Sequence, residues 1–98
     1  MNRQNALTLL SSNYGYIQKN FSVSRLSVFG SVARNESTEK SDIDILVEFA
    51  GKATFDNFMN LKFYLQDLLK AGVHLVTQKA LRPQIKKEIE KELIDVPR

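Results

Sequence analysis

Residues 41–49, Ser-Asp-Ile-Asp-Ile-Leu-Val-Glu-Phe, are the part of the sequence that predicts structure and chemistry together. Apolar residues occupy every second position, and the side chains of a strand alternate between its two faces, so residues 42–49 are expected to form a β-strand. The isoleucines would face a core. Asp42 and Asp44 would then share the opposite face, with their Cα atoms about 6.5–7 Å apart.

Two carboxylates at this separation repel one another unless a partner compensates their charge. A divalent cation is such a partner, because Mg²⁺ prefers carboxylate oxygens and substrate phosphates, and metal ions assist phosphoryl transfer. The alternative is a strand whose polar face carries two solvated aspartates. The pair alone does not decide between these interpretations, so the residues that precede it become important.

Gly30 and Ser31 follow a short β candidate, residues 25–29, at a point where a helix can begin. Glycine lets a backbone approach a phosphate because it has no Cβ, and N–H groups at a helix N-terminus attract anions. Ser31 adds a hydroxyl donor, and Arg34 lies one turn further on and can reach the same phosphates. A plain turn and a solvent-facing arginine explain these features singly. Their order ahead of the two aspartates favours a phosphate site.

The remaining segments predict helices and strands in the order α-β-α-β-α-β-α. Apolar residues spaced three and four apart indicate a helix over residues 3–19, and another that begins after Thr54 and stops at Gly72. A third strand is expected over residues 73–77. The fold class is therefore α/β (α+β), with a small mixed β-sheet covered by helices.

A last helix is expected to follow Arg82, with Pro83 in its first turn. Its apolar face would consist of Ile85, Ile89 and Leu93.

Composition narrows the class of protein. A chain of 98 residues predicts one domain, 1–98. The absence of cysteine excludes disulfides and thiolate metal sites and favours a reducing, cytoplasmic location. No apolar run approaches the roughly 18–20 residues that span a bilayer, so no membrane association is expected. The net charge is +3 without a dense basic run, so no direct contact with nucleic acid is expected.

The sequence resembles the polymerase-β-like nucleotidyltransferase superfamily, whose signature is Gly-Ser, about ten residues, and Asp-x-Asp. The wider stretches are similar to its minimal nucleotidyltransferase branch, and the resemblance spans about residues 22–97. It implies the polymerase-β-like nucleotidyltransferase fold. The stretches that carry it are Phe-Gly-Ser-Val-Ala-Arg at 29–34, residues 41–49, and Leu-Val-Thr-Gln-Lys-Ala-Leu at 75–81.

The resemblance also implies an activity. Gly30 and Ser31 would hold the phosphates of ATP, Asp42 and Asp44 would bind Mg²⁺, and an acceptor hydroxyl would attack the α-phosphorus as pyrophosphate leaves. Members of this branch resemble the antitoxin of a two-gene module whose partner is a HEPN-type RNase toxin, and some transfer AMP to a tyrosine of that partner. We therefore expect a HEPN-type toxin as substrate and a complex with it.

One position departs from the family pattern. The superfamily usually carries a third carboxylate on the next strand, two residues before a Val-Thr pair, and here that residue is His74. Val73 and Leu75 should face the core, which leaves His74 on the same kind of exposed face as the aspartates. A neutral imidazole can ligate a metal or accept a proton, although Mg²⁺ prefers oxygen ligands.

Three interpretations of His74 remain open. It replaces the missing carboxylate in catalysis, or it marks a weakened or inactive antitoxin that neutralises its partner by binding. Alternatively the third carboxylate lies elsewhere, although Asp56 and Asp67 belong to the preceding helix and are poor replacements. Catalysis is preferred because the Gly-Ser and Asp-x-Asp parts would otherwise have no use. A nucleotide-binding regulator without a toxin is a more distant hypothesis.

Overall fold

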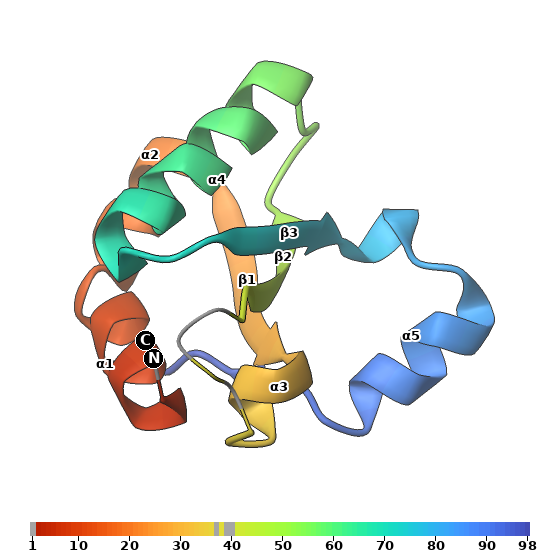
Figure 1. The fold of residues 1–98 in the computed structure, drawn as a ribbon. Helices are drawn as coiled ribbons and strands as arrows, with labels where there is room; N and C mark the ends of the chain where they lie inside the picture. Colours follow the sequence, from red (N-terminus) through yellow and green to blue (C-terminus); the bar gives the residue numbers. More distant parts are fainter. Residues whose placement is uncertain (1, 37, 39–40) are drawn as a thin grey trace.

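The structure, a computed structural model, describes residues 2–36, 38 and 41–98. Figure 1 shows α1, α2 and α4 grouped on one side of a sheet and α5 on the other side. The elements, in chain order, are α1 (Arg3–Ser12), α2 (Tyr14–Phe21), β1 (Val23–Phe29), α3 (Gly30–Ala33), β2 (Ile43–Phe49), α4 (Phe55–Leu69), β3 (Val73–Thr77), a 3₁₀ turn (Gln78–Ala80), α5 (Pro83–Glu90) and β4 (Ile94–Asp95).

The sheet has the strand order β3-β2-β1-β4 and is mixed. β1 pairs antiparallel with β2 and β4, whereas β2 and β3 are parallel. Parallel neighbours need a crossover connection, and α4 supplies it. In the resulting register Asp44 lies opposite Phe29 on one side and opposite His74 on the other. The expected mixed sheet covered by helices is therefore confirmed.

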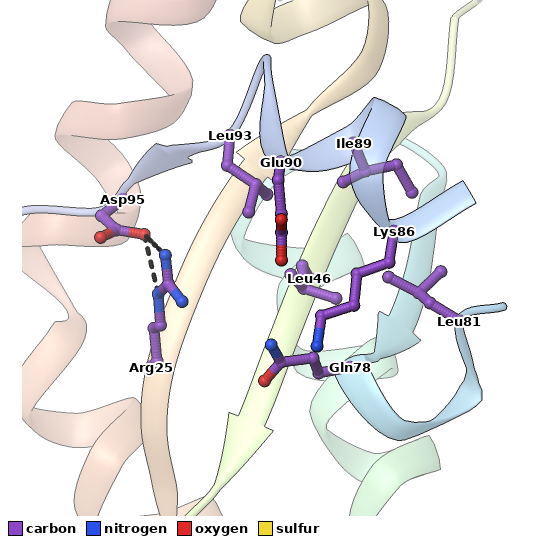
Figure 2. Close-up of a pocket in the computed structure, with 9 residues that line it drawn as sticks. All are labelled: Arg25, Leu46, Gln78, Leu81, Lys86, Ile89, Glu90, Leu93 and Asp95. Carbon is purple, nitrogen blue, oxygen red and sulfur yellow. Dashed lines mark hydrogen bonds and ion pairs between the residues drawn. The ribbon is translucent and has the colours of Figure 1, made fainter. Parts of the chain in front are cut away.

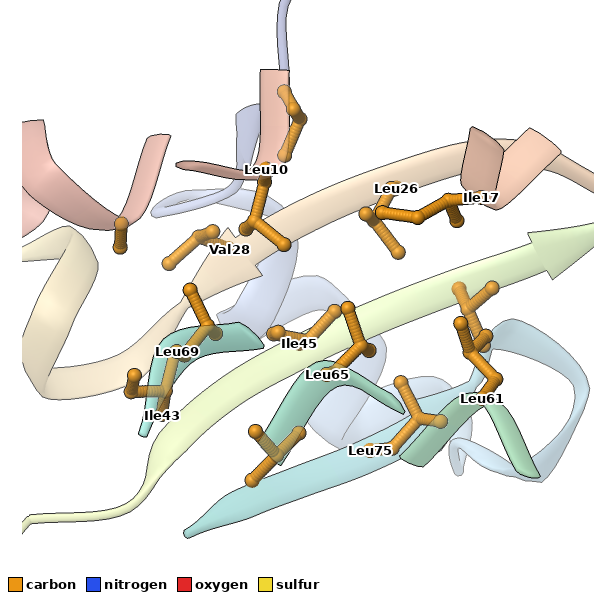
Figure 3. Close-up of a cluster of buried hydrophobic side chains, with 14 of the residues drawn as sticks. Leu10, Ile17, Leu26, Val28, Ile43, Ile45, Leu61, Leu65, Leu69 and Leu75 are labelled. Carbon is orange, nitrogen blue, oxygen red and sulfur yellow. The ribbon is translucent and has the colours of Figure 1, made fainter. Parts of the chain in front are cut away.

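The main core lies between the sheet and the three helices on one of its faces (Figure 3). The inward residues of β2 alternate as expected, and Ile43, Ile45 and Val47 are fully buried. A smaller apolar cluster on the opposite face joins Phe29 and Leu46 to α5. The face that carries Asp44 is thus partly covered by α5.

The expected helix over residues 3–19 is in fact two helices. Asn13 separates them, because its side-chain amide donates to the carbonyl of Leu9 at 2.8 Å and its backbone φ of −112° is not helical. An asparagine side chain that bonds a nearby carbonyl competes with the helix ladder. The second helix then continues past residue 19 to Phe21.

Other boundaries differ by a few residues. Thr54 caps α4 as expected, through a bond from the N–H of Asn57, but the helix ends at Leu69 and Lys70 adopts the left-handed conformation, so Gly72 is not its stop. Ile85 is 48% exposed and does not belong to the buried face of α5.

The strands also differ slightly from their predicted bounds, except β3, which spans residues 73–77 as predicted. β1 begins at residue 23, β2 begins one residue later than expected, and β4 was not predicted. Among the described residues, no helix combines the length and apolar character that a bilayer crossing requires.

Candidate active site

Asp42 and Asp44 stand where β2 begins, and each carboxylate lies against a glycine. Asp44 points away from the main core, because its neighbours Ile43 and Ile45 are buried in it. A Cβ on Gly30 would collide with the carboxylate of Asp44, and a Cβ on Gly72 would collide with that of Asp42. The backbone therefore leaves room for both carboxylates only because glycine occupies these two positions.

His74 lies on an exposed face, where the sequence predicts it, and the structure places it directly beside Asp44. The parallel register of β2 and β3 pairs the two residues, and Nδ1 of His74 is 3.1 Å from Oδ1 of Asp44. Val73 and Leu75 are buried, which leaves the imidazole 63% exposed. In the tautomer with hydrogen on Nδ1, the ring donates to Asp44 and its Nε2 is free to accept a proton.

Gly30 and Ser31 begin α3 directly at the end of β1 (Figure 1). Phe29 is extended, whereas Gly30 has a φ of +72°, which a residue with a side chain rarely adopts. This change of direction turns the chain from the strand into a single helical turn next to Asp44. The structure therefore brings the Gly-Ser pair, Asp44 and His74 together.

Arg34 ends α3, and its guanidinium is already paired with carboxylates. Nη1 donates to Oε2 of Glu92 at 2.7 Å, and Nε donates to Oε2 of Glu36 at 3.2 Å. These bonds, first the one to Glu92 and then the one to Glu36, raise the pKa of the guanidinium. Arg34 is thus held close to the Gly-Ser pair, and its predicted contact with phosphate remains a prediction.

Glu92 is the site residue that sequence reasoning missed. Its Oε1 accepts a bond from the backbone N–H of Gly30 at 3.1 Å, in addition to the bond from Arg34. No local pattern around residue 92 marks it, because the contact joins residues 62 positions apart. Gly72 was noticed in the sequence only as a helix stop, and its contact with Asp42 also depends on the fold.

The donor set allows a magnesium ion only together with a ligand. Across residues 2–36, 38 and 41–98, no three His, Asp or Glu side chains converge to hold a metal ion by themselves. Mg²⁺ commonly binds through one or two carboxylates and fills its remaining positions with water and substrate phosphates. Asp42 and Asp44 fit that mode of binding.

A cavity of about 250 Å³ lies further along the same sheet face, between the sheet and α5 (Figure 2). Leu46 and Ile89 form part of its lining, and both belong to the apolar cluster that also contains Phe29. Arg25 and Lys86 enter it from opposite sides. This cavity is lined by neither aspartate nor His74, so it is separate from the candidate active site.

Comparison with known proteins identifies a family and similar folds. A family model described as nucleotidyltransferase domain matches residues 15–96. A candidate protein adenylyltransferase of Methanocaldococcus jannaschii is 46% identical over 89 residues, which cover 90% of this chain and 91% of that protein.

Two solved structures extend the comparison. A structure described as a candidate minimal nucleotidyltransferase has a TM-score of 0.82 and 32% identity, covering 96% of this chain and 95% of the other. The structure of a tri-AMPylated HEPN toxin in complex with MNT antitoxin, from Shewanella oneidensis, has a TM-score of 0.66 and 17% identity. That match covers 92% of this chain and 71% of the other, and at this identity it shows the shared fold alone.

Proposed function

Because this chain belongs to the nucleotidyltransferase domain family, we propose that it transfers AMP from ATP to a hydroxyl group, most naturally a tyrosine, of a HEPN-type toxin. By modifying this partner in the cytoplasm, and by forming a complex with it, the chain would act as the antitoxin. The observation that carries the proposal is the convergence of Gly30, Asp44 and His74 at one end of the sheet. The similarity to a candidate protein adenylyltransferase supports the nature of the transferred group.

In the proposed reaction the acceptor oxygen forms a bond to the α-phosphorus, and the bond between this phosphorus and the oxygen bridging to the β-phosphate breaks. Pyrophosphate is the leaving group. The N–H and hydroxyl of Ser31 would hold phosphate oxygens, and Gly30, whose own N–H donates to Glu92, would let a phosphate approach because it has no Cβ. Asp42 and Asp44 would hold Mg²⁺, which neutralises phosphate charge when bound.

His74 is proposed to take the proton from the acceptor hydroxyl. Its Nδ1 faces Asp44 at 3.1 Å, so the carboxylate orients the ring and stabilises the imidazolium that forms. The exposure of the ring leaves Nε2 accessible to a substrate. This arrangement gives the histidine a catalytic use without requiring it to bind Mg²⁺.

The test is intact-mass spectrometry of the HEPN-type partner after incubation with this chain, ATP and Mg²⁺. We expect mass additions of whole AMP units with the natural chain and none with Asp44→Asn. Asp67→Asn, which removes an exposed aspartate of α4, is the matched control and should retain transfer. Transfer that survives in the Asp42→Asn/Asp44→Asn double variant would refute the proposal.

A second candidate is an antitoxin that neutralises its partner by binding alone. The observation that favours it is the presence of His74 where the superfamily usually has a third carboxylate. An unmodified partner that co-purifies with this chain would support this function. In that case His74→Asp should create transfer, because it restores an oxygen ligand beside Asp44.

A further inference from the structure

Glu92 connects the C-terminal part of the chain to the Gly-Ser turn. One carboxylate oxygen accepts from the N–H of Gly30 at 3.1 Å, and the other accepts from Nη1 of Arg34 at 2.7 Å. Both bonds are charge-assisted because the acceptor is a carboxylate, and the shorter one, to Arg34, is also an ion pair. A single side chain therefore holds both the first residue of α3 and the arginine that ends it.

The backbone around Glu92 is itself well anchored. Its N–H donates to the carbonyl of Ile89 at 3.0 Å at the end of α5. Ile94 then begins β4, which pairs with β1 just before that strand reaches Gly30. The Glu92 side chain is only 26% exposed. Gly30 follows β1 and Glu92 precedes β4, so the pairing of these two strands fixes both ends of the contact.

The orientation of the Gly30 peptide affects the carboxylate of Asp44, which lies against it. Gly30 has a positive φ and packs so closely on Asp44 that no side chain fits between them. Rotation of this peptide would change the space available to Asp44 and the direction in which α3 begins. The hydrogen bond that this N–H donates to Glu92 opposes such a rotation.

Arg34 is fixed by the same carboxylate. An arginine has five N–H donors in a planar fork, and the bonds to Glu92 and Glu36 engage two of its nitrogen atoms. Two hydrogen bonds fix the orientation of the guanidinium plane, so its remaining N–H donors also point in a fixed direction. Glu92 therefore fixes the Gly30 peptide and the Arg34 guanidinium at once.

We propose that Glu92 is a positioning residue, which holds the Gly30 peptide and the Arg34 guanidinium in the arrangement that receives the polyphosphate of the nucleotide. This role depends on the proposed function in one respect, namely that the ligand is ATP. It differs from a competitor role, in which the carboxylate would occupy the place of a phosphate and hinder binding.

The decisive comparison is between Glu92→Ala and Glu92→Gln. Both variants lose the negative charge, but glutamine retains one oxygen that can accept from the N–H of Gly30, whereas its amide NH2 cannot accept from Arg34. We expect the dissociation constant of Mg²⁺-ATP, measured by calorimetry, to rise about tenfold in Glu92→Ala and clearly less in Glu92→Gln, since a charge-assisted hydrogen bond contributes on this order. KM for ATP should follow, with a smaller change in kcat.

Two controls accompany this pair. Glu88→Ala removes an equal charge from an exposed glutamate of α5, whose ion pair is with Lys91, and should bind ATP like the natural chain. Thermal unfolding of each variant measures any loss of fold. Hydrogen exchange of the Gly30 amide, faster in Glu92→Ala than in Glu92→Gln, reports the bond itself without any nucleotide.

Equal ATP affinity in Glu92→Ala and Glu92→Gln would overturn the positioning role, and so would tighter binding in Glu92→Ala, which is the competitor outcome. Because binding is measured without the toxin, the two proposals can fail separately. An unmodified toxin alongside a Glu92-dependent ATP affinity would refute the transfer reaction only. Normal transfer with an unchanged ATP affinity in every variant would refute the positioning role only.

Discussion

At the scale of single residues, the candidate site depends on two glycines as much as on its two aspartates. Gly30 has a φ of +72° and adjoins Asp44, so a side chain there would meet both backbone strain and a collision. Gly72 has no positive φ, and the atom that a Cβ would meet is the far end of the Asp42 side chain. A side chain at position 72 therefore displaces a carboxylate while the backbone keeps its conformation.

Gly72→Ala should separate activity from stability. We expect AMP transfer to fall at least about tenfold because the carboxylate of Asp42 must move, and a misplacement of about 1 Å can cost more than that. The midpoint of thermal unfolding should change little, since Asp42 is exposed and can rotate. The measurement is the initial rate of transfer alongside thermal unfolding. Gly51→Ala, at a glycine with open space around it, is the control.

Local sequence patterns are sufficient to predict which site residues of a strand or a turn are exposed. Asp42, Asp44 and His74 were predicted on exposed faces because a strand repeats every two residues, and the structure brings Asp44 and His74 together. Glu92 was not predictable in this way, because its role appears only when α5 and β4 are placed against β1. The catalytic and ligand-binding roles of these residues stay predictions until the variants are measured.

At the scale of elements, β4 shows how a strand of two residues is held. It pairs with β1 at Ser27 and Val28, and its Asp95 accepts from the fully buried hydroxyl of Ser27 at 2.5 Å. Arg25 also donates to Asp95, at 3.0 Å (Figure 2). A two-residue strand has no periodicity of its own, so only these long-range contacts define it.

The contacts of Asp95 predict a pH dependence of stability. The Ser27 hydroxyl, and after it the Arg25 guanidinium, lower the pKa of this carboxyl below its ordinary value of 3.8, although partial burial opposes the shift. A lowered pKa in the folded state stabilises the protein above about pH 4, and this stabilisation is lost as the pH falls through the folded-state pKa.

Urea unfolding at pH 7 and pH 3 measures this effect with Asp95→Asn as the variant. The natural chain should lose more unfolding free energy between the two pH values than Asp95→Asn, which has no carboxyl to protonate. Asp67→Asn, with its exposed side chain, should follow the natural chain. An identical pH dependence in the natural chain and Asp95→Asn would show that the Ser27–Arg25–Asp95 contacts contribute nothing.

Helices were easier to predict than their ends. The apolar spacing and the cap at Thr54 identified α4, because both signals are local. The interruption at Asn13 was missed, since its side-chain bond to a preceding carbonyl breaks the ladder without breaking the apolar pattern. The exposure of Ile85 was also missed. The apolar cluster beneath α5 is small and includes Ile89, whereas Ile85 remains 48% exposed.

At the scale of the whole molecule, stability is concentrated on the face of the sheet covered by three helices. Leu65 of α4 is fully buried within this core (Figure 3). The opposite face has only a small apolar cluster beneath α5. The candidate site thus lies on one face of the sheet, and the main core that stabilises the sheet lies on the other face.

Leu65→Ala should lower the free energy of unfolding by about 2–5 kcal/mol, because it removes a buried side chain and leaves a cavity. Ile85→Ala, at an apolar residue that is 48% exposed, should change it by less than about 1 kcal/mol. Urea denaturation of both variants checks the expectation. Similar losses in the two variants would contradict a core confined to the face covered by α1, α2 and α4.

The bond between Gly30 and Glu92 joins residues 62 positions apart, and the loop that it closes contains β2 and β3. Closing such a loop costs conformational entropy, which only the completed fold can offset. The Gly-Ser turn is therefore completed by a contact that only the assembled fold supplies. A nucleotide that binds this turn would bind only the folded chain. It would therefore raise the free energy of unfolding of the whole molecule, in proportion to the logarithm of its concentration once that exceeds the dissociation constant.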